Sequence, residues 1–80
     1  MDDAEIVTRV GELTEEEHQL QRSHAGSPLG AEGLERLRAI EVALDQCWDL
    51  LRQRRALREA GDDPESARVR DPDVVEHYEQ

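Results

Sequence analysis

The chain has 80 residues, of which 36% are hydrophobic and 38% charged, which is enough for one small domain with a thin core. Its formal net charge of −10, from 20 acidic and 10 basic residues, argues against direct binding to nucleic acid or to an anionic membrane, because both need clustered basic side chains. Aromatic residues make up 2% of the chain, too few to line a roomy small-molecule pocket.

The first predicted helix covers about residues 3–23. Asp2 or Asp3 is its expected N-cap, and the acidic residues of its first turn suit the positive end of the helix dipole. Glu17 interrupts the apolar stripe of this helix. We expect Glu17 to set the register or to lie at the edge of the seam, where it can pair with Arg36 or Arg38, rather than to act as a buried functional acid. The apolar residues recur at helical spacing: Ile6, Val10, Leu13 and Leu20.

Residues 24–30 form the predicted loop, in which Gly26 can end the first helix and Pro28 cannot continue it. A second helix is expected from about residue 31 to about residue 60, with Gly61 as its stop. Arginines near its end suit the negative end of the helix dipole. The apolar stripe of this second helix comprises Leu34, Leu37, Ile40, Leu44, Cys47 and Leu51.

Folding the chain back at the loop predicts one register for the two helices. The apolar residues then meet in four pairs: Leu20 with Leu37, Leu13 with Leu44, Val10 with Cys47, and Ile6 with Leu51. The same fold-back brings the acidic start of the first helix (Asp2, Asp3 and Glu5) beside the basic end of the second, namely Arg52, Arg54, Arg55 and Arg58. The expected fold of residues 1–61 is therefore all-α, an antiparallel, coiled-coil-like two-helix hairpin.

Residues 62–80 form an acidic extension that contains two further helix starts, Asp63–Pro64 and Asp71–Pro72, each an acidic cap before a proline. The second start predicts a short helix over residues 72–79. Its apolar face can dock onto the hairpin, and the alternative is a frayed acidic tail. That face consists of Val74, Val75 and Tyr78.

Three segments carry a family resemblance: residues 44–55 (LDQCWDLLRQRR), residues 15–18 (EEEH) and residues 71–78 (DPDVVEHY). Together they resemble the small actinobacterial family called domain of unknown function 2630, over nearly the whole chain. The string from residue 45 to residue 55 is the specific part of this likeness. The resemblance implies a bacterial, cytosolic protein, and it supplies no activity and no catalytic residue.

Glu15 and His18 form a Glu-x-x-His pair of the kind that helices contribute to di-iron carboxylate bundles. Both lie on the flank of the first helix, off the apolar stripe, so a solvated charged face is the favoured interpretation and a metal-binding bundle is an alternative. Cys47 is the only cysteine and sits on an apolar stripe, which favours a buried structural thiol in a reducing cytoplasm. An acidic N-terminus and short apolar runs predict neither an export signal nor a membrane span.

The second helix carries more apolar residues than the first helix can cover. We therefore expect Trp48 and Leu50 to be shielded either by the C-terminal extension or by a second copy of the chain. Tryptophan and arginine are the residue types that anchor protein interfaces. The sequence thus predicts a non-catalytic interaction or assembly module, with no cofactor, that binds a protein partner or itself through Trp48, Leu51, Arg52 and Arg55.

A second alternative is a regulator that binds a transcription or translation machine by inserting the tip of its hairpin. Hairpins of that kind usually carry acidic residues at the tip. The tip here is residues 25–30, AGSPLG, which contain no acidic residue. This interpretation is therefore disfavoured.

Overall fold

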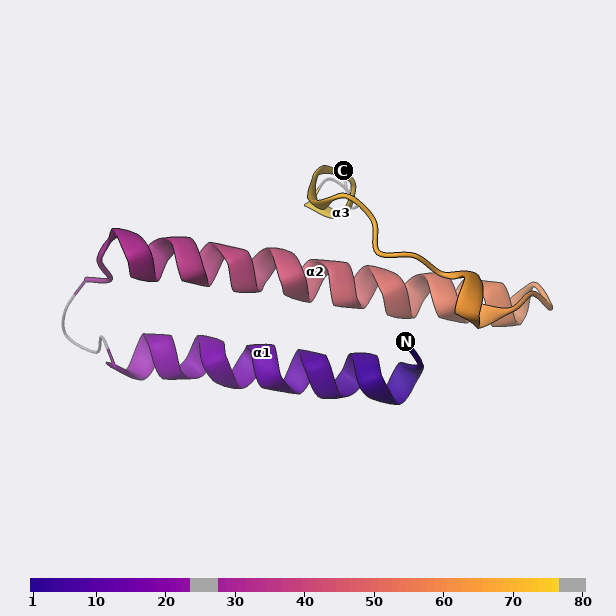
Figure 1. Cartoon of the computed structure of the whole chain (residues 1–80), viewed down its shortest axis with the longest axis horizontal. Helices are drawn as coiled ribbons and strands as arrows, with labels where there is room; N and C mark the ends of the chain where they lie inside the picture. The colour runs from indigo at the N-terminus through magenta and orange to yellow at the C-terminus, as the bar shows by residue number, and fades with distance from the viewer. Residues whose placement is uncertain (24–27, 77–80) are drawn as a thin grey trace.

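The structure, a computed structural model, describes residues 1–23 and 28–76, and these residues form helices without any strand. Helix α1 spans Asp3–Ser23 and α2 spans Ala31–Glu59. A 3-10 turn, η1 (Pro64–Ser66), and a short helix, α3 (Pro72–Glu76), follow. Figure 1 shows α1 and α2 side by side, with the chain after α2 turning back along it. The predicted all-α hairpin with a C-terminal helical extension is confirmed.

Helix α1 begins with a reciprocal capping box between Asp2 and Glu5. The backbone N–H of Glu5 donates to Asp2 Oδ1 at 2.8 Å, and the backbone N–H of Asp2 donates to Glu5 Oε1 at 3.0 Å. These bonds satisfy N–H groups that lack an intrahelical partner, and such a cap contributes about 1 kcal/mol. Asp2 is therefore the cap, which leaves the carboxylate of Asp3 for the arginines of α2.

The seam between α1 and α2 is built from apolar side chains. Ile6, Leu13 and Ile40 are at most 1% exposed, and burial of each such side chain contributes about 1.5–3 kcal/mol. Cys47 and Leu50 are also buried in this core. Further residues are partly buried and pack against it: Val10, Leu20, Ala43, Leu44, Leu51 and Ala67.

Ion pairs at both ends of the seam hold α1 against α2. The guanidinium of Arg54 donates to Asp3 near the open end, in the predicted register, and that of Arg36 donates to Glu16 nearer the loop. Arg36, one of the two partners predicted for Glu17, thus pairs with Glu16 instead. Glu17 itself is partly buried. Its role in setting the register stays a prediction.

Helix α2 ends in a Schellman turn, in which Gly61 adopts a φ of 81°. The N–H of Gly61 donates to the carbonyl of Arg58 at 3.1 Å, and the N–H of Asp62 donates to the carbonyl of Leu57 at 2.8 Å. A residue with a Cβ is strained at this φ, so glycine is favoured. The turn reverses the chain and sends the extension back along α2.

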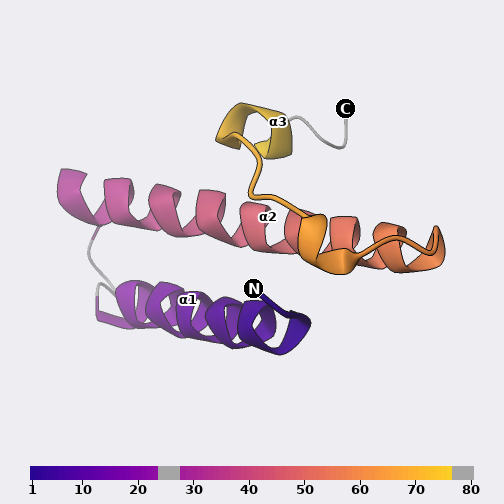
Figure 2. The same cartoon turned by 45° about the vertical axis from the view of Figure 1, so that its right-hand side comes forward.

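Helices α3 and α1 lie on opposite sides of α2, as both Figure 1 and Figure 2 show, whereas η1 lies near the start of α1, since Glu65 Oε2 is 3.7 Å from the N-terminal nitrogen of Met1. Asp63 caps η1 by accepting from the N–H of Glu65 at 3.0 Å, and Asp71 caps α3 by accepting from the N–H of Asp73 at 2.9 Å. Both are positions where the sequence predicted an acidic cap before a proline. The extension therefore contains two locally encoded turns, which place it along the second half of α2.

The predicted docking face of the extension is only partly used. Val75 is 6% exposed and lies in the docked α3, whereas Val74 is 47% exposed. Tyr78 and the predicted stop of the first helix, Gly26, lie outside the described residues. No helix in the described part of the chain is both long and apolar enough to span a membrane.

Candidate interaction surface on the long helix

Helix α2 packs against two different parts of the chain, and a third side of it remains. One side carries Ile40 and Cys47 and meets α1, while another carries Asp49 and Gln53 and meets the extension. Residues of a helix that are spaced alternately by three and four share one side. The third side follows that spacing, and we call it the Trp48 face: Leu34, Leu37, Glu41, Leu44, Trp48, Leu51 and Arg55.

Trp48 lies in the middle of this face and is 49% exposed. Leu50, one of the two residues expected to need a shield, is buried in the core cluster, whereas Trp48 is left open. Leu34, the first member of the apolar stripe read from the sequence, is 54% exposed. In the antiparallel register, residue 34 lies opposite the very end of α1, where too little of α1 remains to cover it.

The other predicted interface residues lie in two environments. Leu51 is partly buried and packs against the core, so only part of its side chain is accessible. Arg52 and Arg55 are exposed one and two turns beyond Trp48. Arg55 Nε donates to Glu59 Oε1 at 3.1 Å, and Arg52 also has an interaction within the chain. The structure therefore brings Trp48 and the two arginines to one side of α2 and turns Leu51 inward.

A shallow hollow of about 210 Å³ extends the Trp48 face toward the loop, and it is lined by Leu34, Leu37, Arg38 and Glu41. Along one edge of the face runs a row of exposed charged residues at intervals of seven, which we call the charged flank: Arg38, Asp45, Arg52 and Glu59. An apolar centre with a charged edge is the usual composition of a protein interface. Leu44 and Leu51 also pack against the core, whereas Leu34, Trp48 and the charged flank are exposed.

Asp49 anchors the extension and is fully buried. The guanidinium of Arg70 donates to both of its carboxylate oxygens, with Nε 2.9 Å from Oδ2, and Gln53 Nε2 donates to Oδ2 at 2.8 Å. The bonds from Arg70 and Gln53 hold the pKa of Asp49 below its ordinary value, although burial acts in the opposite direction. Since all of these partners belong to the fold, Asp49 is a structural anchor.

Two glutamine side chains of α2 bind the backbone of the extension. Gln53 Nε2 donates to the carbonyl of Arg68 at 2.7 Å and its Oε1 accepts from the N–H of Arg68 at 3.2 Å. Gln46 Nε2 donates to the carbonyl of Arg70 at 3.1 Å. The extension therefore docks largely through polar contacts. Such contacts produce no periodic pattern of apolar residues, so the sequence does not reveal them.

Arg54 joins three segments and is 6% exposed. Its guanidinium donates to Asp3, to the carbonyls of Met1 and Pro64 at 2.9 and 3.2 Å, and to Glu65 Oε1 at 3.2 Å. The bond with Asp3 raises the pKa of Arg54 further above its ordinary value. Arg54 is thus part of the fold, and it lies beside the acidic start of α1 as the fold-back predicted.

Cys47 lies in the core, 8% exposed, as the sequence predicted. Burial raises the pKa of its thiol, and the charge of Arg9 only partly offsets this effect. A buried thiol with a raised pKa is a poor nucleophile. The geometry therefore agrees with a structural thiol.

The proposed Glu-x-x-His pair does not form a metal site with its neighbours. Glu15 Oε1 accepts from Arg22 Nη2 at 3.1 Å and from Gln19 Nε2 at 3.5 Å, and His18 is exposed. Among residues 1–23 and 28–76, no group of three or more His, Cys, Asp or Glu side chains is arranged to hold a metal ion.

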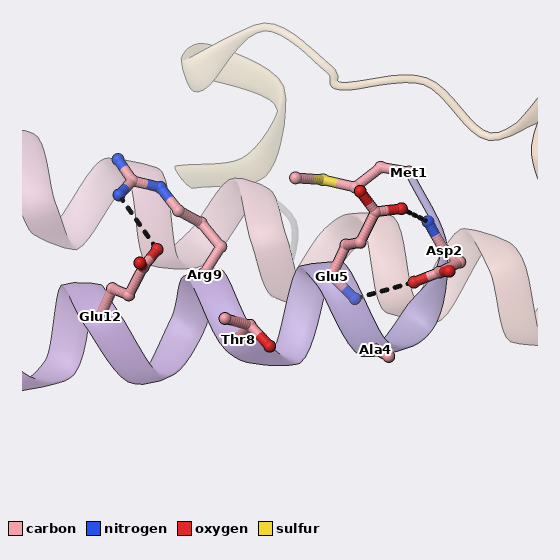
Figure 3. A pocket seen from close by; sticks show the side chains of 7 residues that line it. All are labelled: Met1, Asp2, Ala4, Glu5, Thr8, Arg9 and Glu12. Carbon is pink, nitrogen blue, oxygen red and sulfur yellow. Dashed lines mark hydrogen bonds and ion pairs between the residues drawn. The ribbon is translucent and has the colours of Figure 1, made fainter.

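A second hollow, of about 410 Å³, runs along the outer side of α1 (Figure 3). Its polar side chains bond to each other. Asp2 and Glu5 form the capping box, and Arg9 Nη1 lies 3.8 Å from Glu12 Oε1. Because its charged groups are engaged with each other and one helix supplies its whole lining, this hollow is a weaker candidate than the Trp48 face.

The sequence profile of a family described as "Protein of unknown function (DUF2630)" matches residues 2–80. The chain belongs to this family. It is also similar to uncharacterized proteins of Mycobacterium tuberculosis (Rv0898c) and Mycobacterium bovis (Mb0922c), each 50% identical over 78 residues, which cover 95% of this chain and 88% of the relative. No solved structure matches it. The family resemblance read from the sequence is thus confirmed, and members of the DUF2630 family named here have no stated activity.

Proposed function

We propose that this DUF2630 protein is a non-catalytic interaction or assembly module of the cytoplasm that binds a protein through the Trp48 face. The contact residues are Trp48, Arg52 and Arg55, with Leu51 contributing the accessible part of its side chain. Helix α2 presents these residues on a stiff support, because α1 and the extension hold it from two other sides.

The observation that supports this proposal is a half-exposed tryptophan on a helix that is covered on two other sides. Burying the exposed part of a tryptophan removes apolar surface from water, and tryptophans at the centre of an interface commonly contribute 2 kcal/mol or more. Exposed charged residues surround Trp48, which is the arrangement of an interface with an apolar centre and a polar rim. The exposed part of the Trp48 side chain contributes no burial to the core of the single chain.

The alternative of a metal-binding carboxylate bundle has less support. Glu15 is occupied by Arg22 and Gln19, so a metal ion would first have to displace these partners. The alternative of a regulator that inserts its hairpin tip rests on residues 25–30, of which residues 25–27 lie outside the described part of the chain. Neither alternative has a specific contact in its favour.

The test is an affinity capture with three baits: the wild-type protein, Trp48→Ala and Val69→Ala. Val69 is 63% exposed on the extension, away from the Trp48 face, so its substitution is a matched loss of exposed apolar surface. We expect at least one protein to bind the wild-type and Val69→Ala baits and to be lost with Trp48→Ala. Identical sets of bound proteins from all three baits would rule out the Trp48 face.

A further inference from the structure

We propose that the occupant of the Trp48 face is a second copy of this chain, with the two α2 helices packed antiparallel around a two-fold axis near Trp48. This inference rests on the proposed function and specifies its partner. It follows from the spacing of the apolar residues on α2 and from the order of charges beside them.

The residues of the Trp48 face, in which Glu41 and Arg55 stand among apolar side chains, have the spacing of a coiled-coil seam. From Leu37 to Arg55 the intervals are four, three, four, three and four residues, so one stripe runs along more than two heptads. When two such stripes meet in opposite directions, Trp48 of one helix packs beside Leu51 of the other, and the two-fold axis repeats this contact. Leu44 then lies against the aliphatic part of Arg55 from the second copy.

The charged flank determines the register of this pairing. Its four members alternate in sign along α2: Arg38, Asp45, Arg52 and Glu59. In an antiparallel pair, flanking residues at the same heptad position face each other across the seam. With Trp48 beside Leu51 of the second copy, Asp45 faces Arg52 and Arg38 faces Glu59. The two-fold axis makes four opposite-charge contacts from these two pairs.

Registers displaced by one heptad are disfavoured by the same residues. A shift in one direction places Asp45 opposite Asp45 and Arg38 opposite Arg52, while a shift in the other places Arg52 opposite Arg52 and Asp45 opposite Glu59. Like charges across a seam are destabilising and are a recognised means of excluding the wrong register. Among these three registers, the flank is therefore self-complementary only in the one that places Trp48 beside Leu51, and this register also makes the most opposite-charge contacts.

The rest of the fold leaves room for this partner and offers it no better surface. Figures 1 and 2 show α1 and α3 on opposite sides of α2. With both elements in place, Trp48 is still 49% exposed, so neither has to move for a partner to contact it. On α1, the exposed large apolar residue within the helix is Val7, and it has no apolar stripe around it. A pairing through α2 thus buries more apolar surface than one through α1.

The sedimentation mass of the protein tests the pairing, measured at about 0.15 M salt, where the Debye length is about 8 Å and the repulsion between the two acidic copies is largely screened. We expect a concentration-dependent shift from the monomer mass of 9.1 kDa to twice that mass. Trp48→Ala should weaken association about 100-fold, because it removes a central aromatic contact from both copies. A wild-type protein that stays monomeric up to millimolar concentration, or an unchanged association of Trp48→Ala, would overturn the proposal.

Charge reversal on the flank tests the register. Asp45→Arg places arginine against Arg52, and Arg52→Asp places aspartate against Asp45, so each variant alone should associate about tenfold more weakly. Mixed together, the two variants restore opposite charges at every flank contact and should form a heterodimer about as stable as the wild-type dimer. Glu35→Arg is the control, since it makes the same charge change as Asp45→Arg at an exposed residue off the face. If Asp45→Arg behaves like Glu35→Arg, or if the mixture does not recover, the register is wrong.

The two proposals fail in different ways. If the wild-type protein is monomeric while Trp48→Ala still loses a captured protein, the second copy is not the partner and the interaction function stands. If Trp48→Ala changes neither the sedimentation mass nor the captured proteins, the Trp48 face has no binding role. Circular dichroism of each variant, compared with the wild type, shows whether the fold is retained.

Discussion

The two covered sides of α2 are held by different physical means. Toward α1, the side chains of Ile6, Leu13 and Ile40 are withdrawn from water, and ion pairs lie only at the ends of the seam. Toward the extension, the contacts are mainly polar, namely a buried carboxylate with its arginine and two glutamine side chains on backbone groups, beside the apolar side chains of Val75 and Ala67. One side is stabilised by non-directional burial, the other by directional bonds whose partners must all be present.

This difference predicts how the molecule comes apart. Loss of the apolar seam should unfold the whole chain, because the seam holds both long helices. Loss of the polar anchors should release the extension and leave the hairpin folded. The predictions that follow compare the two sides, beginning with the largest expected effect.

The largest effect is expected at the seam. Ile40→Ala leaves a cavity in a core that is fully closed at this position, and a change of this kind costs about 2–5 kcal/mol. Urea unfolding followed by circular dichroism measures it, and the extension should be lost in the same transition as the hairpin. Val69→Ala, at an exposed position, should change stability by less than about 0.5 kcal/mol. A small effect of Ile40→Ala would show that the seam is not the main source of stability.

The anchor of the extension should give the next effect. Arg70→Ala leaves the buried carboxylate of Asp49 without its main partner, and breaking a buried pair in this way costs about 3 kcal/mol. Hydrogen exchange should show faster exchange in residues 64–75 and little change within α1. Arg68→Ala is the matched control, because the side chain of Arg68 binds only carbonyls of its own segment. Equal exchange in the two variants would contradict the anchoring role of Asp49.

Acid should act on the same anchor. The bonds from Arg70 hold the folded-state pKa of Asp49 below the ordinary value of 3.8, so the unfolded or undocked state takes up a proton first as the pH falls. The stabilisation is therefore complete above about pH 5 and is lost as the pH falls through the lowered folded-state pKa. The amide resonance of Val75 should report undocking in this acidic range. In Asp49→Asn that pH dependence should be absent, and its persistence would assign the effect to other carboxylates.

Two glycines should give the smallest effects, with opposite signs. Gly61→Ala forces a Cβ into a φ of 81° at the turn that starts the extension, at a cost of about 1 kcal/mol. Gly11→Ala lies within α1, where a Cβ meets nothing within 4 Å, and should stabilise the helix by about 1 kcal/mol. Thermal unfolding measures both. A destabilising Gly11→Ala would reveal a close contact at that position.

The sequence predicted the apolar side of α2 far better than the polar one. Helical spacing predicts that Ile6, Leu13 and Ile40 point inward, because burial depends on periodicity that can be read directly. No comparable pattern predicts that Asp49 is buried. The arginine that compensates its charge lies 21 residues further along the chain, and no periodicity links the two positions. The fold-back predicted Arg54 beside the acidic start of α1 but not that it is buried, because composition alone does not show which arginine reaches several acceptors at once.

For the candidate site, the sequence predicted which residue types gather on one side of α2 but not which of them are covered. It predicted a shield for both Trp48 and Leu50 and could not separate the two. The structure separates them, because the extension follows the polar anchors and these lie on the same side as Leu50. Trp48 therefore stays exposed because Asp49, Gln46 and Gln53, which bind the extension, lie on a different side of α2.

The most direct test of the central claim is the solvent exposure of Trp48 as a function of protein concentration. Trp48 is the only tryptophan, so the quenching of its fluorescence by acrylamide reports this face alone. In dilute protein we predict quenching typical of a half-exposed indole. At high concentration, quenching should be strongly reduced in the wild type and in Glu35→Arg, whereas Asp45→Arg should show no such reduction. Quenching of the wild-type protein that is the same at every concentration would contradict the claim that a second copy covers the Trp48 face.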